Sequence, residues 1–264
     1  MMVNQFGALL REWRETRRIS QLDLALQADV SSKHVSFLET GRNQPSREMI
    51  MRLTQAMDIP LRDRNNLLHA AGFAPAYSES PFDAPAIQEA EEALTRILEK
   101  QEPYPAIVLD ADWRLVRQNR GALSMGELFL PGNLAVGVNA LELLFSPDGL
   151  QPFVVNWEEL SAMLLMRLWR EVTAPGASDQ QRNLFEALTR MPTTPDDWRS
   201  TAVELPAGPT VDMVLRKDGR EYAFFTTITT FGTAQDITLS ELRIESYFPS
   251  NEETRLLCKS WSAN

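Results

Sequence analysis

The segment that decides the fold of the N-terminal part of the chain is Ser20-Gln21-Leu22-Asp23-Leu24-Ala25, followed by Val30-Ser31-Ser32-Lys33-His34-Val35-Ser36-Phe37-Leu38-Glu39-Thr40-Gly41-Arg42. Ser20 stands where a helix N-cap is expected, and Asp23 follows three residues later, close to a capping box. Ser31 can cap a second helix, whose apolar residues Val35 and Leu38 recur at helical spacing and which Gly41 ends. The segment therefore predicts two short helices joined by a turn.

Further helices are expected on both sides of this pair. Phe6, Leu9, Leu10 and Trp13 form an apolar stripe at helical spacing before it. After it, Pro45-Ser46 opens a fourth helix, and Pro60 begins a fifth that ends at Gly72. Residues 1–73 are therefore predicted to fold as a five-helix, all-α bundle, and the Pro/Ser-rich residues 74–83 are expected to be a linker.

The remaining residues, 84–264, mix helical and strand patterns. A helix is expected from Ala84 to Lys100 and a stronger one from Asn156 to Val172. Strands are expected over residues 106–110, 113–118, 210–216, 221–230 and 237–248. Asp218-Gly219 between two β-rich runs is a typical hairpin turn. The pattern predicts an α+β domain with an antiparallel sheet.

The composition is that of a folded chain that is not stabilised by disulfide bonds or structural metal ions. Of 264 residues, 44% are hydrophobic and 23% are charged, which is ordinary globular usage and suggests two domains. The single cysteine, Cys258, cannot form an internal disulfide or supply a zinc site alone, so no metal is expected. No cofactor is expected either, because residues 84–264 contain no histidine for a haem and Cys258 lies too near the C-terminus for a photochemical flavin site. No apolar run approaches the ~18 residues of a membrane span, so we expect a cytoplasmic protein with no membrane contact.

The net charge of −10 is distributed unevenly along the chain. Up to Phe73 there are ten basic and eight acidic residues, a balance of +2. The remainder has 16 basic and 28 acidic residues, a balance of −12. Only the N-terminal part is therefore suited to a phosphate-rich partner.

The two-helix segment resembles the helix-turn-helix of repressor-type proteins, with small Ala25 where the helices cross and apolar Val30 in the turn. This resemblance implies that the helix from Ser32 to Glu39 enters the major groove of double-stranded DNA. Glu39 itself is expected to form an ion pair within the domain, because it would repel a phosphate. The expected DNA-binding residues are Gln21, Ser31, Ser32, Lys33, Ser36, Phe37, Arg42 and Asn43. Lys33 can donate to guanine and Phe37 can pack on a thymine methyl group, whereas Gln21, Arg42 and Asn43 are expected at the DNA backbone.

Nearly the whole chain resembles the MmyB-like branch of the Xre-family regulators. The resemblance rests on residues 30–42, Pro45-Ser46-Arg47-Glu48-Met49, residues 60–65 and 70–74, Pro103-Tyr104-Pro105-Ala106, Trp113, Asn119-Arg120, Pro147-Asp148-Gly149, Asn156-Trp157-Glu158-Glu159, residues 226–232, Asp236, residues 241–246 and Phe248-Pro249. It implies a PAS-like C-terminal domain with a pocket for a small apolar effector of the fatty-acid type. We expect the protein to bind a pseudo-palindromic operator as a homodimer, with the two recognition helices about one turn of DNA apart.

The residues of the second part are compatible with such a pocket. Methionine adapts to flexible hydrocarbon shapes, and a few placed polar groups can hold a head group. The expected ligand-binding residues are Tyr104, Asn119, Asn156, Met163, Met166, Arg167, Phe225 and Arg243. For Arg243 a cross-strand pair with a glutamate is an equal alternative, and for Arg167 a structural role is the stronger one. Trp113 and Trp157 are expected in the core.

Two other functional classes fit the sequence less well. The sequence features that favour an enzyme are carboxylate pairs such as Asp110 with Asp112 and Glu158 with Glu159. The sequence shows no Ser/His/Asp set, no glycine-rich phosphate-binding loop and no metal-binding cluster. Adjacent acids on a helix point about 100° apart, so Glu158 and Glu159 do not share a cleft. An antitoxin-like or protein-binding regulator, with a C-terminal domain used only for dimerisation, is the other alternative.

Overall fold

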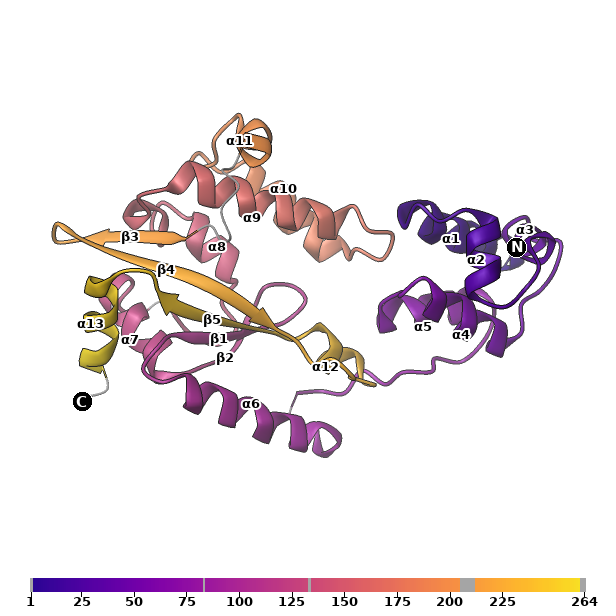
Figure 1. The fold of residues 1–264 in the computed structure, drawn as a ribbon, viewed down its shortest axis with the longest axis horizontal. Helices are drawn as coiled ribbons and strands as arrows, with labels where there is room; N and C mark the ends of the chain where they lie inside the picture. Colours follow the sequence, from indigo (N-terminus) through magenta and orange to yellow (C-terminus); the bar gives the residue numbers. More distant parts are fainter. Residues whose placement is uncertain (1, 83, 133, 205–211, 262–264) are drawn as a thin grey trace. The chain divides into compact units, whose positions relative to one another are not determined.

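The computed structural model describes residues 2–82, 84–132, 134–204 and 212–261 (Figure 1). The chain divides into two compact units. Unit 1 comprises Met1–Pro81 with the segments Thr173–Ala177 and Thr233–Ser240, and unit 2 comprises Phe82–Val172, Ser178–Gly232 and Glu241–Asn264.

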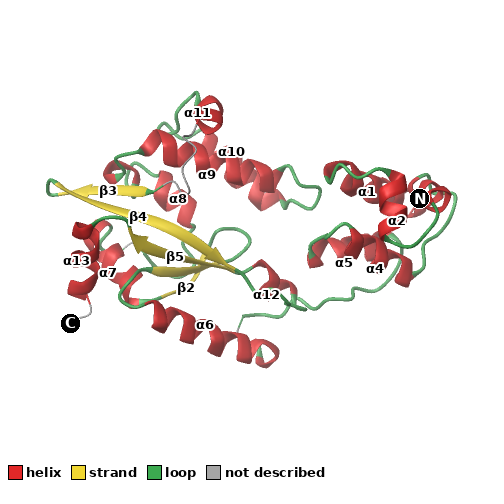
Figure 2. Cartoon of the chain, in the orientation of Figure 1, coloured by secondary structure: helices red, strands yellow, loops and turns green. Residues whose placement is uncertain are grey.

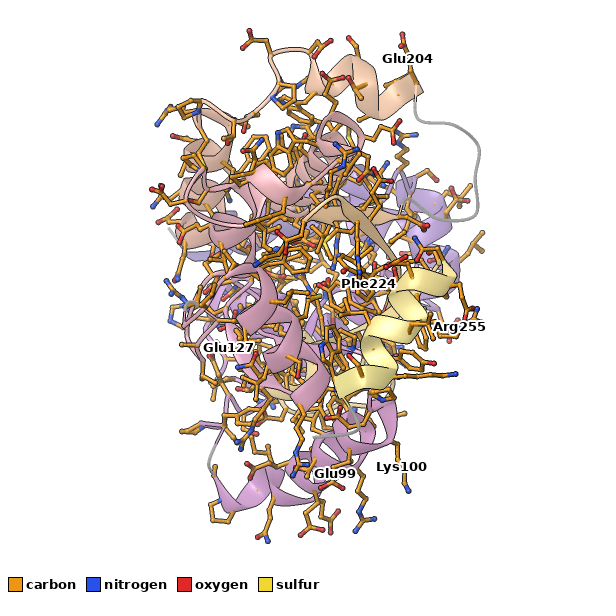
Figure 3. The ribbon with its side chains drawn as sticks, turned by 90° about the vertical axis from the view of Figure 1, so that its left-hand side faces the viewer. Glu99, Lys100, Glu127, Glu204, Phe224 and Arg255 are labelled. Carbon is orange, nitrogen blue, oxygen red and sulfur yellow. The ribbon has the colours of Figure 1, made fainter. Side chains whose placement is uncertain are left out.

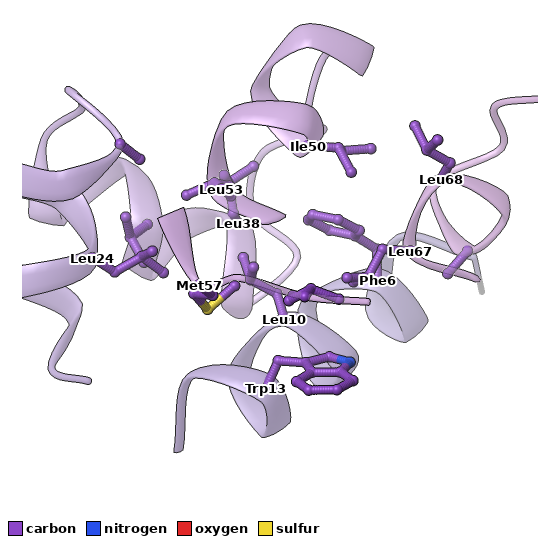
Figure 4. Packing of buried hydrophobic residues seen from close by; sticks show 14 of the residues in the cluster. Phe6, Leu10, Trp13, Leu24, Leu38, Ile50, Leu53, Met57, Leu67 and Leu68 are labelled. Atoms are coloured by element: carbon purple, nitrogen blue, oxygen red, sulfur yellow. The ribbon is translucent and has the colours of Figure 1, made fainter. Parts of the chain in front are cut away.

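Unit 1 contains the five predicted helices: α1 (Met2–Thr16), α2 (Gln21–Gln27), α3 (Ser32–Glu39), α4 (Arg47–Ala56) and α5 (Leu61–Ala70). The expected caps are confirmed, since the Ser20 and Ser31 hydroxyls accept the backbone N–H groups of Asp23 and His34. Gly41 follows α3 with a φ of 69°, a left-handed conformation that glycine adopts without strain. Phe6, Leu10, Leu24, Leu38 and other apolar residues of all five helices form one buried core (Figure 4).

One buried carboxylate joins the first three helices. The Arg14 guanidinium of α1 donates two hydrogen bonds to Glu39 of α3, at 2.6 and 3.0 Å, and the Gln21 amide of α2 donates a third, at 2.8 Å. The side chain of Glu39 is only 2% exposed. The ion pair expected for Glu39 is thus confirmed, and it fixes the angle between α2 and α3 because each helix supplies one partner.

The segment 74–81 is held along its length within unit 1. Asn65 of α5 accepts the backbone N–H groups of Ala76 and Tyr77 and donates to the Tyr77 carbonyl. Further along, the backbone N–H of Ser80 donates to Asp236 at 3.1 Å, and the Thr238 hydroxyl donates to the Ser80 carbonyl at 2.7 Å. Burial acts to raise the pKa of Asp236, but hydrogen bonds from Ser80, Ser78 and Leu239 together outweigh it, and the pKa is lowered.

Unit 2 is built on a five-stranded antiparallel sheet in the order β2-β1-β5-β4-β3 (Figure 2). The strands are β1 (Ala106–Leu109), β2 (Leu115–Gln118), β3 (Met213–Lys217), β4 (Arg220–Thr229) and β5 (Arg243–Pro249). The helices are η1 (Pro85–Ile87), α6 (Gln88–Gln101), α7 (Arg120–Phe129), α8 (Ala140–Phe145), η2 (Gln151–Phe153), α9 (Trp157–Val172), α10 (Asp179–Thr189), α11 (Trp198–Glu204) and α13 (Glu252–Trp261). The predicted α+β domain with an antiparallel sheet is confirmed.

The two faces of the sheet are covered by different helices. In Figure 1, α6 lies on one side of the sheet and α8 and α9 lie on the other. The labelled side chains of Figure 3 show the contrast between surface and interior, because Glu99 and Lys100 project outward from the end of α6 whereas Phe224 of β4 lies inside and is fully buried. No described helix combines the length and apolar character that a bilayer crossing requires.

Two predictions about the end of the chain need correction. The strand expected over residues 237–248 begins only at Arg243, because Ile237–Glu241 forms a short helix, α12. The Asp236 carboxylate accepts the Thr238 N–H at this helix start, a local bond that favours a turn over an extended chain. The strand expected over residues 210–216 is β3, Met213–Lys217; residues 210 and 211 lie outside the described part. The predicted Asp218-Gly219 turn is confirmed, with positive φ at both residues.

The Glu39 cluster generates a stability prediction. Glu39→Ala leaves the Arg14 guanidinium and the Gln21 amide without their shared acceptor, so we expect the free energy of unfolding of unit 1 to fall by about 3 kcal/mol. Urea denaturation of the variant measures this loss. Arg11→Ala is the matched control, because Arg11 pairs with Glu15 on the exposed face of α1 and its removal should leave stability unchanged. Equal losses for the two variants contradict the role of Glu39.

The lowered pKa of Asp236 generates a pH prediction. A carboxylate with a lowered folded-state pKa stabilises the fold above its unfolded pKa of about 3.9, and this contribution is lost as the pH falls through the folded pKa. Asp236→Asn should therefore lower the free energy of unfolding by about 1–2 kcal/mol at pH 7. The difference from the wild type should shrink below about pH 4, in urea titrations at several pH values. A difference that stays constant down to about pH 2 would show that the charge of Asp236 does not matter.

Candidate functional site

The outer face of α3 presents the polar residues predicted to meet DNA. Val35 and Leu38 are fully buried and orient the helix. Ser32, Lys33, Arg42 and Asn43 are exposed, whereas Ser36 and Phe37 are partly buried. The exposed residues therefore share one surface at α3 and the turn after it, as a helix that enters the major groove requires.

Phe37 lies between two cations on this surface. The Lys33 ammonium is 5.5 Å and the Arg42 guanidinium carbon is 5.7 Å from the centre of the Phe37 ring. The backbone N–H groups of Arg42 and Asn43 both donate to the Phe37 carbonyl, at 2.8 and 3.2 Å. The ring attracts both positive charges, so Lys33, Phe37 and Arg42 form one cluster with a basic exterior.

Gln21 and Ser31 have internal partners as well. The Gln21 amide donates to Glu39, and the Ser31 hydroxyl accepts the His34 N–H as the cap of α3. Ser31 is exposed and Gln21 is partly exposed, at the starts of α3 and α2. Their DNA-binding role stays a prediction, in addition to these structural roles.

A mostly apolar cavity of about 120 Å³ lies in unit 2 between the sheet and helices α7, α8 and α9. Its lining residues come from every strand but β2 and from all three helices: Ile107, Leu109, Trp113, Met125, Leu134, Ala140, Leu141, Leu143, Leu144, Leu150, Leu160, Met163, Leu164, Arg167, Met213, Thr226, Glu245 and Tyr247. Three of them are methionines. Such a lining suits a flexible hydrocarbon.

The polar lining of this cavity centres on one ion pair. Arg167 of α9 donates to Glu245 of β5 at 3.2 Å, and the Tyr247 hydroxyl donates to the same carboxylate at 3.3 Å. The Glu245 side chain is 11% exposed. The Arg167 guanidinium carbon lies 4.4 Å from the ring centre of Trp113. Burial and the neighbouring Glu245 charge raise the pKa of Tyr247 well above its usual range, so its hydroxyl stays neutral.

A second ion pair, between Arg243 and Glu171, lies next to the first, and Trp113 contacts the arginines of both pairs. Arg243 of β5 lies 3.0 Å from Glu171 of α9, and its guanidinium carbon lies 4.9 Å from the Trp113 ring centre. The indole N–H of Trp113 donates to Glu171 at 3.1 Å. Trp113 is only 2% exposed and has a φ of 64°. It is a core residue, as expected, and lines the cavity as well.

The structure places the predicted ligand-binding residues in two groups. Met163 and Arg167 line the cavity, and Arg243 lies beside it in the ion pair with Glu171. Tyr104, Asn119, Asn156, Met166 and Phe225 are not among the described residues that line it. Met166 packs partly buried against the core on another side of α9.

The residues outside the cavity have structural partners. Asn119 caps α7, accepting the Ala122 and Ala106 N–H groups, and donates to the Tyr104 carbonyl. Asn156 accepts the Val214 N–H and donates to the Asp212 carbonyl, which ties the start of α9 to β3. Phe225 and Tyr104 pack on Phe248, with ring centres 5.2 and 6.3 Å apart. Because Thr226 and Tyr247 line the cavity, their strand neighbours Phe225 and Phe248 point to the opposite face.

Sequence reasoning missed Glu245 and Tyr247. Arg243, Glu245 and Tyr247 share one face of β5, since side chains alternate along a strand. The prediction of Arg243 as a ligand-binding residue could therefore have been extended to Glu245 and Tyr247. Among the residues that the structure describes, no cluster of His, Cys, Asp and Glu side chains is suited to hold a metal ion.

Two family models match this chain, one over its N-terminal helices and one over the part that contains the sheet. Residues 5–67 match the family model of a helix-turn-helix domain, and residues 90–259 match that of the MmyB-like transcription regulator ligand binding domain. The HTH-type transcriptional regulator RghRB of Bacillus subtilis (strain 168) is 32% identical over 98 residues, which cover 37% of this chain and 64% of that protein. The chain thus spans less than two thirds of the length of this curated relative.

Two solved structures show weaker overall likeness. The clp gene regulator ClgR of Corynebacterium glutamicum is 27% identical, covering 39% of this chain and 96% of its own, with a TM-score of 0.25. An RNA-binding light-oxygen-voltage receptor is 13% identical, covering 98% of this chain and 63% of its own, with a TM-score of 0.24. The assignment rests on the family models, the second of which spans most of the chain. The chain belongs to the MmyB-like transcription regulator family, with a helix-turn-helix domain before its ligand-binding domain.

Proposed function

We propose that this chain is a one-component regulator, which binds operator DNA through α3 and whose DNA affinity is set by a small apolar molecule of the fatty-acid type. The observation that carries the proposal is the apolar cavity with an arginine in its lining, in the domain that matches a ligand-binding family. The protein acts by binding rather than by turnover. It binds DNA as a homodimer on a pseudo-palindromic operator, whose half-sites lie about 34 Å apart.

The surface around α3 supports DNA as the partner of unit 1. The Lys33 ammonium can donate to the O6 and N7 atoms of guanine, and the Phe37 edge can pack on a thymine methyl group. Arg42 lies just past the helix end, where a guanidinium meets the phosphate backbone. The excess of basic residues up to Phe73 favours this partner, whereas the acidic remainder of the chain disfavours it.

The cavity supports an amphiphile as the effector. Its volume of about 120 Å³ is smaller than the roughly 300–1,000 Å³ of typical ligand pockets, so a long chain needs side chains to move. Met125, Met163 and Met213 line it and are unbranched, so they can change rotamer at low cost. Arg167 can receive the acid group. The effector changes DNA affinity only if it binds the DNA-competent and incompetent arrangements unequally.

Lys33 and Arg42 should have distinct effects on DNA binding. Lys33→Ala should cost about 1–3 kcal/mol at the operator and relax specificity at one base position, because it removes a base contact. Operator fragments with single base changes, measured by fluorescence anisotropy, give both quantities. An equal loss on random DNA contradicts base recognition by Lys33.

Arg42→Ala is the matched control on the same surface. Removing a phosphate contact should weaken binding to all sequences alike and reduce the salt slope of log K by about 1. The salt dependence of binding for wild type and variant shows this directly. An unchanged slope places Arg42 away from the phosphates.

A further inference from the structure

We propose that an acid ligand enters the cavity together with one proton, which it shares with Glu245. This inference rests on the proposed function, because it concerns the same cavity and the same class of ligand. It assigns Glu245 as the residue that makes acid binding depend on pH and that distinguishes an acid from a neutral head group.

The charges at the polar end of the cavity are already balanced. Arg167 lies 3.2 Å from Glu245, and Arg243 lies 3.0 Å from Glu171. Arg167 is farther from Glu171, at 3.7 Å, and that carboxylate also accepts the Trp113 indole N–H. Each guanidinium therefore has its own carboxylate before any ligand arrives, and an incoming acid adds a third negative charge to two positive ones.

Within the described part of the chain, the elements packed around Glu245 supply no further cation to neutralise an added charge. In β5 its neighbours on the same face are Arg243 and Tyr247. On β1 and β4 the residues paired with Glu245 are the apolar Ile107 and Ile228. From α9 the facing charged residues are Arg167 and Glu171. The titratable groups in the cavity lining are Arg167, Glu245 and Tyr247, and the tyrosine is held neutral.

The carboxylate of an acid ligand would be the third at the polar end of this cavity, after Glu171 and Glu245. It cannot stay ionised beside an ionised Glu245 at low cost. Two carboxylates that share one cation repel each other in an apolar surrounding, so one of them takes up a proton. The pair then titrates as a unit, and the proton bridges the ligand oxygen and Glu245. The proton comes from the buffer. A neutral head group such as an alcohol needs none, because it can donate to Glu245 directly.

Calorimetry of the full-length protein tests this with two probes of equal chain length, decanoate and decanol. Titrations at about pH 7 in two buffers of different ionisation enthalpy count the protons taken up on binding. We expect about one proton per decanoate and none per decanol. The Kd of decanoate should rise about tenfold per pH unit between about pH 6 and pH 8, as linkage to one proton requires, while the Kd of decanol stays constant.

Glu245→Gln removes the second carboxylate and keeps the shape of the side chain. Decanoate should then bind Arg167 as the anion, without proton uptake and without the pH slope. Glu159→Gln, at an exposed acid of α9, is the matched control and should take up a proton as the wild type does. Because the wild-type measurement stands alone, the test does not depend on folding of either variant.

The outcomes separate the inference from the proposed function. Decanoate binding to the wild type without proton uptake overturns the inference and leaves the proposed effector class intact. The same holds if the Glu245→Gln substitution leaves proton uptake unchanged. Binding of decanol but not decanoate overturns the inference and the acid class together. If neither probe binds, the proposed ligand role of the cavity fails.

Discussion

The packing of α9 against the sheet is the constraint on which the ligand-binding domain depends. Leu165 and Leu168 are fully buried in the core beneath the helix. With about 3.6 residues per turn, this fixed face places Leu160, Met163 and Arg167 along the cavity. Arg167 therefore reaches Glu245 on β5 without any loop to position it. The polar end of the cavity is held by two regular elements, α9 and β5, which keep its side chains in fixed positions.

The same interaction between cations and an aromatic ring recurs in both domains. Phe37 holds Lys33 and Arg42 on the exposed surface of the helix-turn-helix domain, and Trp113 holds Arg167 and Arg243 beside the cavity. Arg167 and Arg243 are each paired with a glutamate, which makes the environment of Trp113 close to neutral. The exposed cations at Phe37 suit attraction of a polyanion, and the paired cations at Trp113 suit selection among small molecules.

Local rules predicted the helix-turn-helix domain well because its signals are local. The serine caps, the glycine after α3 and the apolar spacing of Val35 and Leu38 act within a few residues, and the structure confirms each of them. The cavity was harder to predict, because Arg167 and Glu245 are 78 residues apart and meet only through the tertiary fold. Asn119 and Asn156 lie outside the cavity lining because their amides bind backbone groups: Asn119 caps α7, and Asn156 ties the start of α9 to β3. The strand prediction was wrong for α12, because the hydrogen bond from the Thr238 N–H to Asp236 favours a helix start over the extended chain that its β-branched residues suggest.

Mass spectrometry of small molecules released from gently purified protein shows whether the cavity of unit 2 holds an apolar effector. The comparison is with Leu164→Trp, which fills part of the cavity from α9. We expect an aliphatic acid or a similar amphiphile at close to one molecule per chain in the wild type, and its loss from the variant. An equal amount of amphiphile in both proteins, or decanoate that fails to bind an empty wild-type protein, would show that the cavity is not the site of an apolar effector.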